Sequence, residues 1–270
     1  HKELMIMSKK LAALLMSAFL SVGTQAATET WNMRSTGSGG EGSFNHGGYG
    51  NTLTINKADN TLRVTGWADT AYQDGSTGGT GDDYLQTTKL ERWSGGLGST
   101  NQHPNDSHTI DNFSGGDDTD MVLLSFEKAI SLSEVNIGYT TGTVDVTVVG
   151  YTGSGTPDPS DMEGKTWSQV QGSPSVWQTV SELLSVNVGA HAVNAVGITS
   201  KYWLIGACNS VFNTATCRDG RCDHGGGFKL ATVTGTTPNG GGEVPAPASV
   251  LLVLAGLLAM QRSSKKKLAA

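Results

Sequence analysis

Nine short runs rich in Val, Thr, Ile, Tyr and Trp recur through the middle of the chain, separated by clusters of Gly, Asn, Asp, Ser and Pro. β-branched and aromatic residues favour strands, and such clusters form turns. After Val144, valines alternate with polar residues, which is typical of a strand with one buried face. The pattern predicts an all-β fold, an antiparallel β-sandwich that is jelly-roll-like. The runs are residues 52–56, 62–67, 84–90, 121–126, 135–139, 144–151, 193–199, 202–206 and 228–234.

Helical character is scarce between these runs. A turn or two of helix is expected only around residues 179–184. Three stretches rich in Gly and Asp, residues 35–50, 74–83 and 93–120, are expected to be long loops.

The amino-terminal segment has the layout of a secretory signal peptide. Lys9 and Lys10 precede an apolar stretch of residues 11–22, and small residues follow around Ala26. We predict a signal helix in residues 1–26, with cleavage after Ala26. A retained membrane anchor is the alternative, but the apolar stretch is short for a span of about 20 residues.

The carboxyl-terminal segment, residues 244–270, combines a Pro-Ala-Pro element, an apolar helix and a basic tail. By the positive-inside rule the tail lies in the cytoplasm, which places the β-sandwich domain, residues 27–236, outside the inner membrane. The glycine-rich linker 237–243 joins the two parts. We predict a sorting signal built from Val244, Pro245, Ala246, Pro247, Ala248, Ser249, Arg262, Lys265, Lys266 and Lys267.

Charge excludes one class of partner. The chain has 18 basic and 24 acidic residues, and because seven basic residues and one acidic residue lie in the terminal segments, the central part has a net charge of about −12. Such a domain does not bind nucleic acid by neutralising phosphates. A soluble surface protein and a cation-binding protein both remain compatible with this charge.

The three cysteines, Cys208, Cys217 and Cys222, lie close together in the sequence. Asp219 and Gly220 form a turn between the last two, so a local disulfide between Cys217 and Cys222 is expected. Cys208 is then a buried thiol, or it replaces one of the other two as a partner. Zinc binding with His224 is the alternative, although the spacing fits no standard zinc pattern.

The terminal sequence Val-Pro-Ala-Pro-Ala-Ser, with its leucine-rich run and basic tail, resembles the PEP-CTERM sorting signals that exosortases process in Gram-negative bacteria. The commoner signal has Glu between the prolines, where this chain has Ala246. The resemblance implies an exosortase-type membrane protease or transpeptidase as a partner. It also implies an inner-membrane intermediate, followed by the cell surface or the extracellular space.

Several short segments in the central part of the sequence are similar to the XDP-type family of exosortase-dependent surface proteins. The resemblance implies transport, sorting and surface display, and it supplies no enzymatic activity. Cys208-Asn209 stands where an aromatic-Asn pair is expected, and residues 217–222 look like a local addition. The segments that carry this resemblance are residues 37–39 and 50–52, the Trp-Ser-Gly-Gly-Leu-Gly run 93–98, residues 108–126, and the Ser-Lys-Tyr-Trp-Leu-Ile-Gly-Ala run 200–207.

An acidic loop before residue 121 is the candidate metal site. Carboxylates spaced along a loop can supply the oxygen ligands of calcium, although the spacing does not match an EF-hand. The structural alternative is an Asx-turn at Asp111 followed by a solvated turn. The candidate ligands are Asp111, Asp117, Asp118 and Asp120.

Trp93, next to Gly95 and Gly96, is the candidate ligand-binding residue. Its ring is either an exposed platform for a sugar or a core tryptophan at a glycine-rich bend. We therefore expect a non-enzymatic exported surface or extracellular-matrix protein. One alternative is a calcium-assisted glycan-binding module of the exopolysaccharide matrix. A polysaccharide-modifying enzyme is the other, but no pair of carboxylates in the sequence is singled out for that chemistry.

Overall fold

The computed structural model describes residues 27–71, 83–103, 106–112, 119–212 and 226–238. They belong to one compact unit that extends from Ala27 to Pro238. The predicted signal helix and the predicted sorting signal lie outside the described residues. None of the helices that the structure describes is long and apolar enough to cross a membrane.

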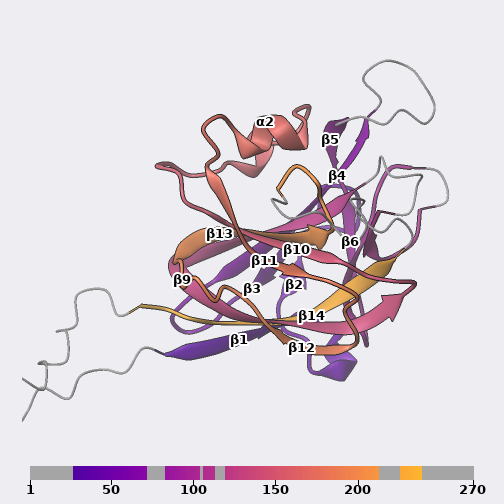
Figure 1. Cartoon of the computed structure of the whole chain (residues 1–270). Coiled ribbons are helices and arrows are strands. Elements are labelled where there is room, and N and C mark those ends of the chain that lie inside the picture. Colours follow the sequence, from indigo (N-terminus) through magenta and orange to yellow (C-terminus); the bar gives the residue numbers. More distant parts are fainter. Residues whose placement is uncertain (1–26, 72–82, 104–105, 113–118, 213–225, 239–270) are drawn as a thin grey trace, which may run out of the picture. The chain divides into compact units, whose positions relative to one another are not determined.

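Antiparallel strands form two layers that are joined by one long strand, β9 (Asp120–Thr141). The first half of β9 pairs with β4 (Leu62–Ala71) and β13 (Ser200–Ala207). Its second half pairs with β12 (Gly189–Ala192) and β14 (Gly227–Thr236). The predicted all-β antiparallel sandwich is thus confirmed (Figure 1).

The two layers are named here the β13 sheet and the β14 sheet. The strands of the β13 sheet follow the order β11–β10–β13–β9–β4. Beyond this row, β4 also pairs with β3 and β5, and β3 pairs with β2. In the β14 sheet, β14 pairs with β9 along one edge and with β1, β7 and β8 along the other. The remaining elements are β1 (Thr28–Asn32), β2 (Ser43–Phe44), β3 (Leu53–Ile55), β5 (Tyr84–Thr87), β6 (Lys89–Trp93), β7 (Gly96–Thr100), β8 (Ile110–Asp111), β10 (Val146–Tyr151), β11 (Trp177–Leu183), η1 (Thr36–Ser38), η2 (Pro159–Asp161) and α2 (Trp167–Gln171).

The main hydrophobic core lies between the two sheets. It contains Trp203 of β13 and Val135 of β9, together with Trp31 of β1, whose ring meets Phe126 edge to face at 4.8 Å. Strands of both sheets contribute alternate residues to this core, as expected for a sandwich.

The β13 sheet is also covered on its other face. Leu123 and Leu204 belong to a second buried cluster, which includes Trp167 of α2. Thr166 and Gln169 form a capping box at the start of α2. Burial on both faces explains why the sequences of β13 and the start of β9 are almost continuously apolar.

The structure corrects several expectations about individual elements. Residues 179–184, expected to be helical, lie mostly in β11, which pairs with β10. Residues 121–126 and 135–139 belong to the single strand β9. The expected loop 93–120 contains β7 and β8, because its glycines allow close pairing with neighbouring backbone.

Residues 193–199 form a loop instead of the expected strand. Asn194 has φ +58°. Its amide group accepts from the backbone N–H of Ile198 at 3.0 Å and donates to the backbone carbonyl of the same residue at 2.9 Å. A side chain that closes a turn in this way competes with strand pairing.

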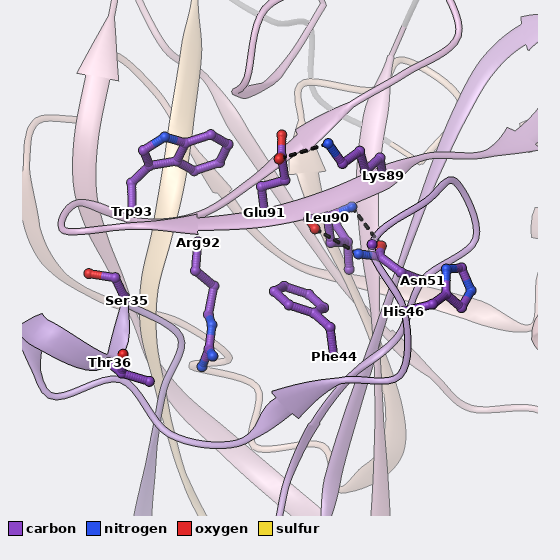
Figure 2. Close-up of a pocket in the computed structure, with 11 residues that line it drawn as sticks. Ser35, Thr36, Phe44, His46, Asn51, Lys89, Leu90, Glu91, Arg92 and Trp93 are labelled. Atoms are coloured by element: carbon purple, nitrogen blue, oxygen red, sulfur yellow. Dashed lines mark hydrogen bonds and ion pairs between the residues drawn. The ribbon is translucent and has the colours of Figure 1, made fainter.

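Asn51 fixes β6 through a pair of side-chain hydrogen bonds (Figure 2). It is 1% exposed, and its amide accepts from the N–H of Leu90 and donates to the carbonyl of Leu90, both at 2.8 Å. We expect Asn51→Ala to lower the free energy of unfolding by about 2–4 kcal/mol, because two buried backbone groups lose their partners.

Chemical denaturation measures this change. The neighbouring variant Thr52→Ala is the control and should cost less than about 1 kcal/mol, because Thr52 is only half-buried. A loss below about 1 kcal/mol for Asn51→Ala would mean that the amide does not hold β6.

Candidate functional site

Trp93 is the last residue of β6, where the chain turns back into β7. This turn packs closely on two other strands: a Cβ atom at Gly95 would lie 2.9 Å from Cβ of Tyr139, and one at Gly96 would lie 2.5 Å from the carbonyl oxygen of Leu230. Gly96 has φ +130°, a conformation that favours glycine. The two glycines thus bring Trp93 against β9 and β14.

Lys229 of β14 places its ammonium group over the indole ring of Trp93. Nζ lies 3.4 Å from the centre of that ring and 5.6 Å from the centre of the Tyr139 ring. The residue is 8% exposed. Within the part of the chain that the structure describes, Nζ has no ion pair or hydrogen bond. Aromatic faces thus surround a cation that has no carboxylate in contact.

Burial lowers the pKa of Lys229, and the negative charge of Glu91 opposes this shift. An ammonium group taken out of water is costly unless something compensates its charge. A cation–π contact of a desolvated ammonium contributes about 2 kcal/mol. Trp93 therefore supplies part of the compensation for Lys229.

His108 completes the aromatic group. Its ring stacks on Trp93 with centroids 5.4 Å apart and an interplanar angle of 20°. Its Nδ1 lies 3.3 Å from Oγ1 of Thr100. The close approach depends on Gly98, since a Cβ atom there would lie 2.0 Å from the carbonyl oxygen of His108.

These side chains line a pocket of about 550 Å³, named here the Lys229 pocket. Its size falls within the range of about 300–1,000 Å³ that is usual for small-molecule sites. Tyr139, one of the lining residues, is 43% exposed. The lining residues are Trp93, Ser94, Gly95, Ser107, His108, Thr109, Tyr139, Thr141 and Lys229.

A second pocket, of about 460 Å³, lies next to β6 (Figure 2). Arg92 and Phe44 lie across the strand from Trp93, and the guanidinium is 5.4 Å from the centre of the Phe44 ring. Arg92 donates to the carbonyl oxygens of Glu41 at 2.5 Å and Gly42 at 3.2 Å. Lys89 pairs with Glu91 at 2.8 Å. The cations of this pocket already have partners, which favours a structural role.

The surroundings of Trp93 match neither of the two sequence-based interpretations in full. The residue is half-buried at a glycine-rich bend, and its ring contacts Lys229 and His108. It is neither an isolated exposed platform nor a fully buried core residue.

The predicted calcium ligands are only partly described. Asp111 accepts from the hydroxyls of Ser107 and Thr109, both at 2.5 Å. Asp120 is buried and accepts from the Asn101 amide at 3.1 Å. Asp117 and Asp118 lie outside the described residues. No group of three His, Cys, Asp or Glu side chains that could hold a metal occurs among the residues that are described. Calcium binding stays a prediction.

Cys208 is disulfide-bonded. The other two cysteines of the chain, Cys217 and Cys222, lie outside the described residues. Because the chain has three cysteines, a bond of Cys208 with either of them excludes the expected pair between Cys217 and Cys222. The alternative left open by the sequence, in which Cys208 takes the place of Cys217 or Cys222 in the disulfide, accounts for this bond.

The fold and the site define an antiparallel β-sandwich with an aromatic, lysine-containing pocket beside β14 and β9. In comparisons with protein-family models, curated proteins and solved structures, no match to the chain was found.

Sequence reasoning found Trp93 but missed its partner Lys229 and also Tyr139, whose ring lies near the Lys229 ammonium. Lys229 occupies an interior position of an apolar strand, and this unusual placement was the one signal in the sequence. The pairing of Lys229 with Tyr139 across β14 and β9 requires the strand register.

Proposed function

We propose that the chain is an exported protein of the cell surface or extracellular matrix of a Gram-negative bacterium, without an enzymatic role. An exosortase-type membrane protein removes its sorting segment, residues 244–270, from an inner-membrane intermediate. The proposal rests mainly on the Pro-Ala-Pro element, the apolar run and the basic tail of residues 244–270, and the pairing of β1 with β14 is consistent with it.

The first and last strands of the domain lie side by side. Thr28 is opposite Thr236, and the N–H of Thr237 donates to the carbonyl oxygen of Ala27 at 3.3 Å. The hydrogen-bonded structure therefore extends from the first residue after the proposed signal peptide to the first residue of the glycine-rich linker. This arrangement supports a domain that keeps its fold when both terminal segments are removed.

The disulfide of Cys208 also supports export. Disulfides form and persist outside the cytoplasm, where thiols are not kept reduced. An exported protein meets this condition in the periplasm and at the cell surface.

Exchange of both prolines of the sorting signal tests the processing step. Proline fixes φ and keeps the segment extended for a protease cleft. Each change to alanine returns about 0.4–1 kcal/mol of backbone entropy to the free segment. We expect Pro245→Ala/Pro247→Ala to slow processing roughly four- to thirtyfold in a host that contains the exosortase.

Pulse-labelling of the full chain gives the processing rate. Gly241→Ala, in the linker, is the matched control and should leave the rate unchanged. A double variant that is processed at the rate of the unchanged chain would contradict recognition through the prolines.

A further inference from the structure

We propose that the Lys229 pocket binds an acidic saccharide, with the carboxylate of a uronic acid residue on Lys229 and the sugar ring against Tyr139. This inference concerns the ligand of the domain and goes beyond the proposed export and sorting. It does not depend on calcium.

The position of Lys229 provides the first argument. The residue is 8% exposed, lines the pocket and has no ion-pair partner among the described residues. Burial lowers its pKa, and the contact with Trp93 compensates the charge only in part. A ligand carboxylate in the pocket would supply the missing negative charge and form a charge-assisted hydrogen bond.

The surroundings of the ammonium favour a sugar over a simple anion. Tyr139 is 43% exposed, and aromatic rings provide flat apolar surface for the C–H face of a pyranose. The hydroxyls of Ser94 and Thr141 also line the pocket and can bond to sugar hydroxyls. An apolar wall with a few polar groups is the usual composition of a small-molecule site.

Charge favours one carboxylate over a phosphate group. Glu91 is close enough to influence Lys229 electrostatically, and the domain around the pocket is acidic. A dianion would be repelled by these charges more strongly than a monoanion. The single positive charge of the pocket is therefore best matched by a ligand group with a single negative charge, such as one carboxylate.

Calorimetric titration of the purified full chain tests the proposal with three probes: tetragalacturonate, the neutral tetrasaccharide of galactose, and inorganic phosphate. We expect binding of tetragalacturonate, with at least about tenfold weaker binding of the other two. Equal affinity for the neutral sugar would overturn the role of the carboxylate. Equal affinity for phosphate would overturn the saccharide, and no binding of tetragalacturonate would overturn the proposal.

Variants locate the site. Lys229→Met keeps most of the apolar part of the side chain and should weaken tetragalacturonate binding roughly ten- to one-hundredfold, because one charge-assisted hydrogen bond is lost. Lys201→Met removes an exposed lysine of β13 and should leave affinity unchanged. Full affinity in Lys229→Met would overturn the assignment.

Tyr139→Ala keeps the test decisive if Lys229→Met does not fold. Because the ring is exposed, its loss should spare the fold and weaken binding of tetragalacturonate severalfold. Unchanged affinity in this variant would contradict the placement of the sugar ring. Failure of the sorting experiments would leave these titrations unaffected, so the two proposals are tested separately.

Discussion

Trp203→Ala is expected to lower the free energy of unfolding by about 3–5 kcal/mol, a large part of the stability of a domain. Trp203 is fully buried on β13, between β10 and β9. Its Nε1 donates to the carbonyl oxygen of Ser200 at 3.1 Å. The ring also packs on Gly150, where a Cβ atom would lie 2.9 Å from it. Removing the ring leaves a cavity between strands whose backbones are fixed by pairing.

Denaturant unfolding of the purified protein measures this loss. Val196→Ala is the control, because Val196 is 62% exposed and its truncation should change stability by less than about 0.5 kcal/mol. A loss below about 1 kcal/mol for Trp203→Ala would contradict the placement of Trp203 in the main core between the two sheets.

Deletion of residues 244–270 is expected to abolish surface display while leaving the domain folded. Display depends on the sorting segment in our proposal, whereas the fold closes at the pairing of β1 with β14. Surface labelling of cells should find almost none of the truncated chain, and the unfolding midpoint of the secreted protein should match that of the processed chain.

A shortened linker provides the control for this deletion. A chain that lacks residues 240–242 keeps the sorting segment and should be displayed normally. Display of the truncated chain at the level of the full chain would contradict a sorting role for residues 244–270.

The fold class could be predicted because the strands are short, β-branched and separated by turn residues. The long strand β9 could not be predicted as one element. Its polar middle, around Glu127 and Lys128, has the composition of a loop, but the strand passes there from one sheet to the other. Local composition does not reveal that a strand changes partners.

The prediction of a helix at residues 179–184 was wrong for a related reason. Short apolar patterns are ambiguous between helix and strand, and pairing with β10 decides in favour of β11. The real helix, α2, had a readable signal in the capping box of Thr166 and Gln169.

The candidate site was only half predictable. The glycines after Trp93 indicated a bend, but Lys229, one partner of the indole, lies far away in sequence, and nothing in the local pattern pairs His108 with Trp93. Lys229 reaches Trp93 because the turn after β6 packs on β14, a contact that depends on the whole sandwich.

Mass spectrometry of the mature protein from its native envelope tests the central claim most directly. If the carboxyl-terminal segment is a sorting signal, the mature chain should end near Pro247, and peptides from residues 250–270 should be missing. Mature protein that retains residues 250–270 intact would contradict the proposed processing and, with it, the proposed function.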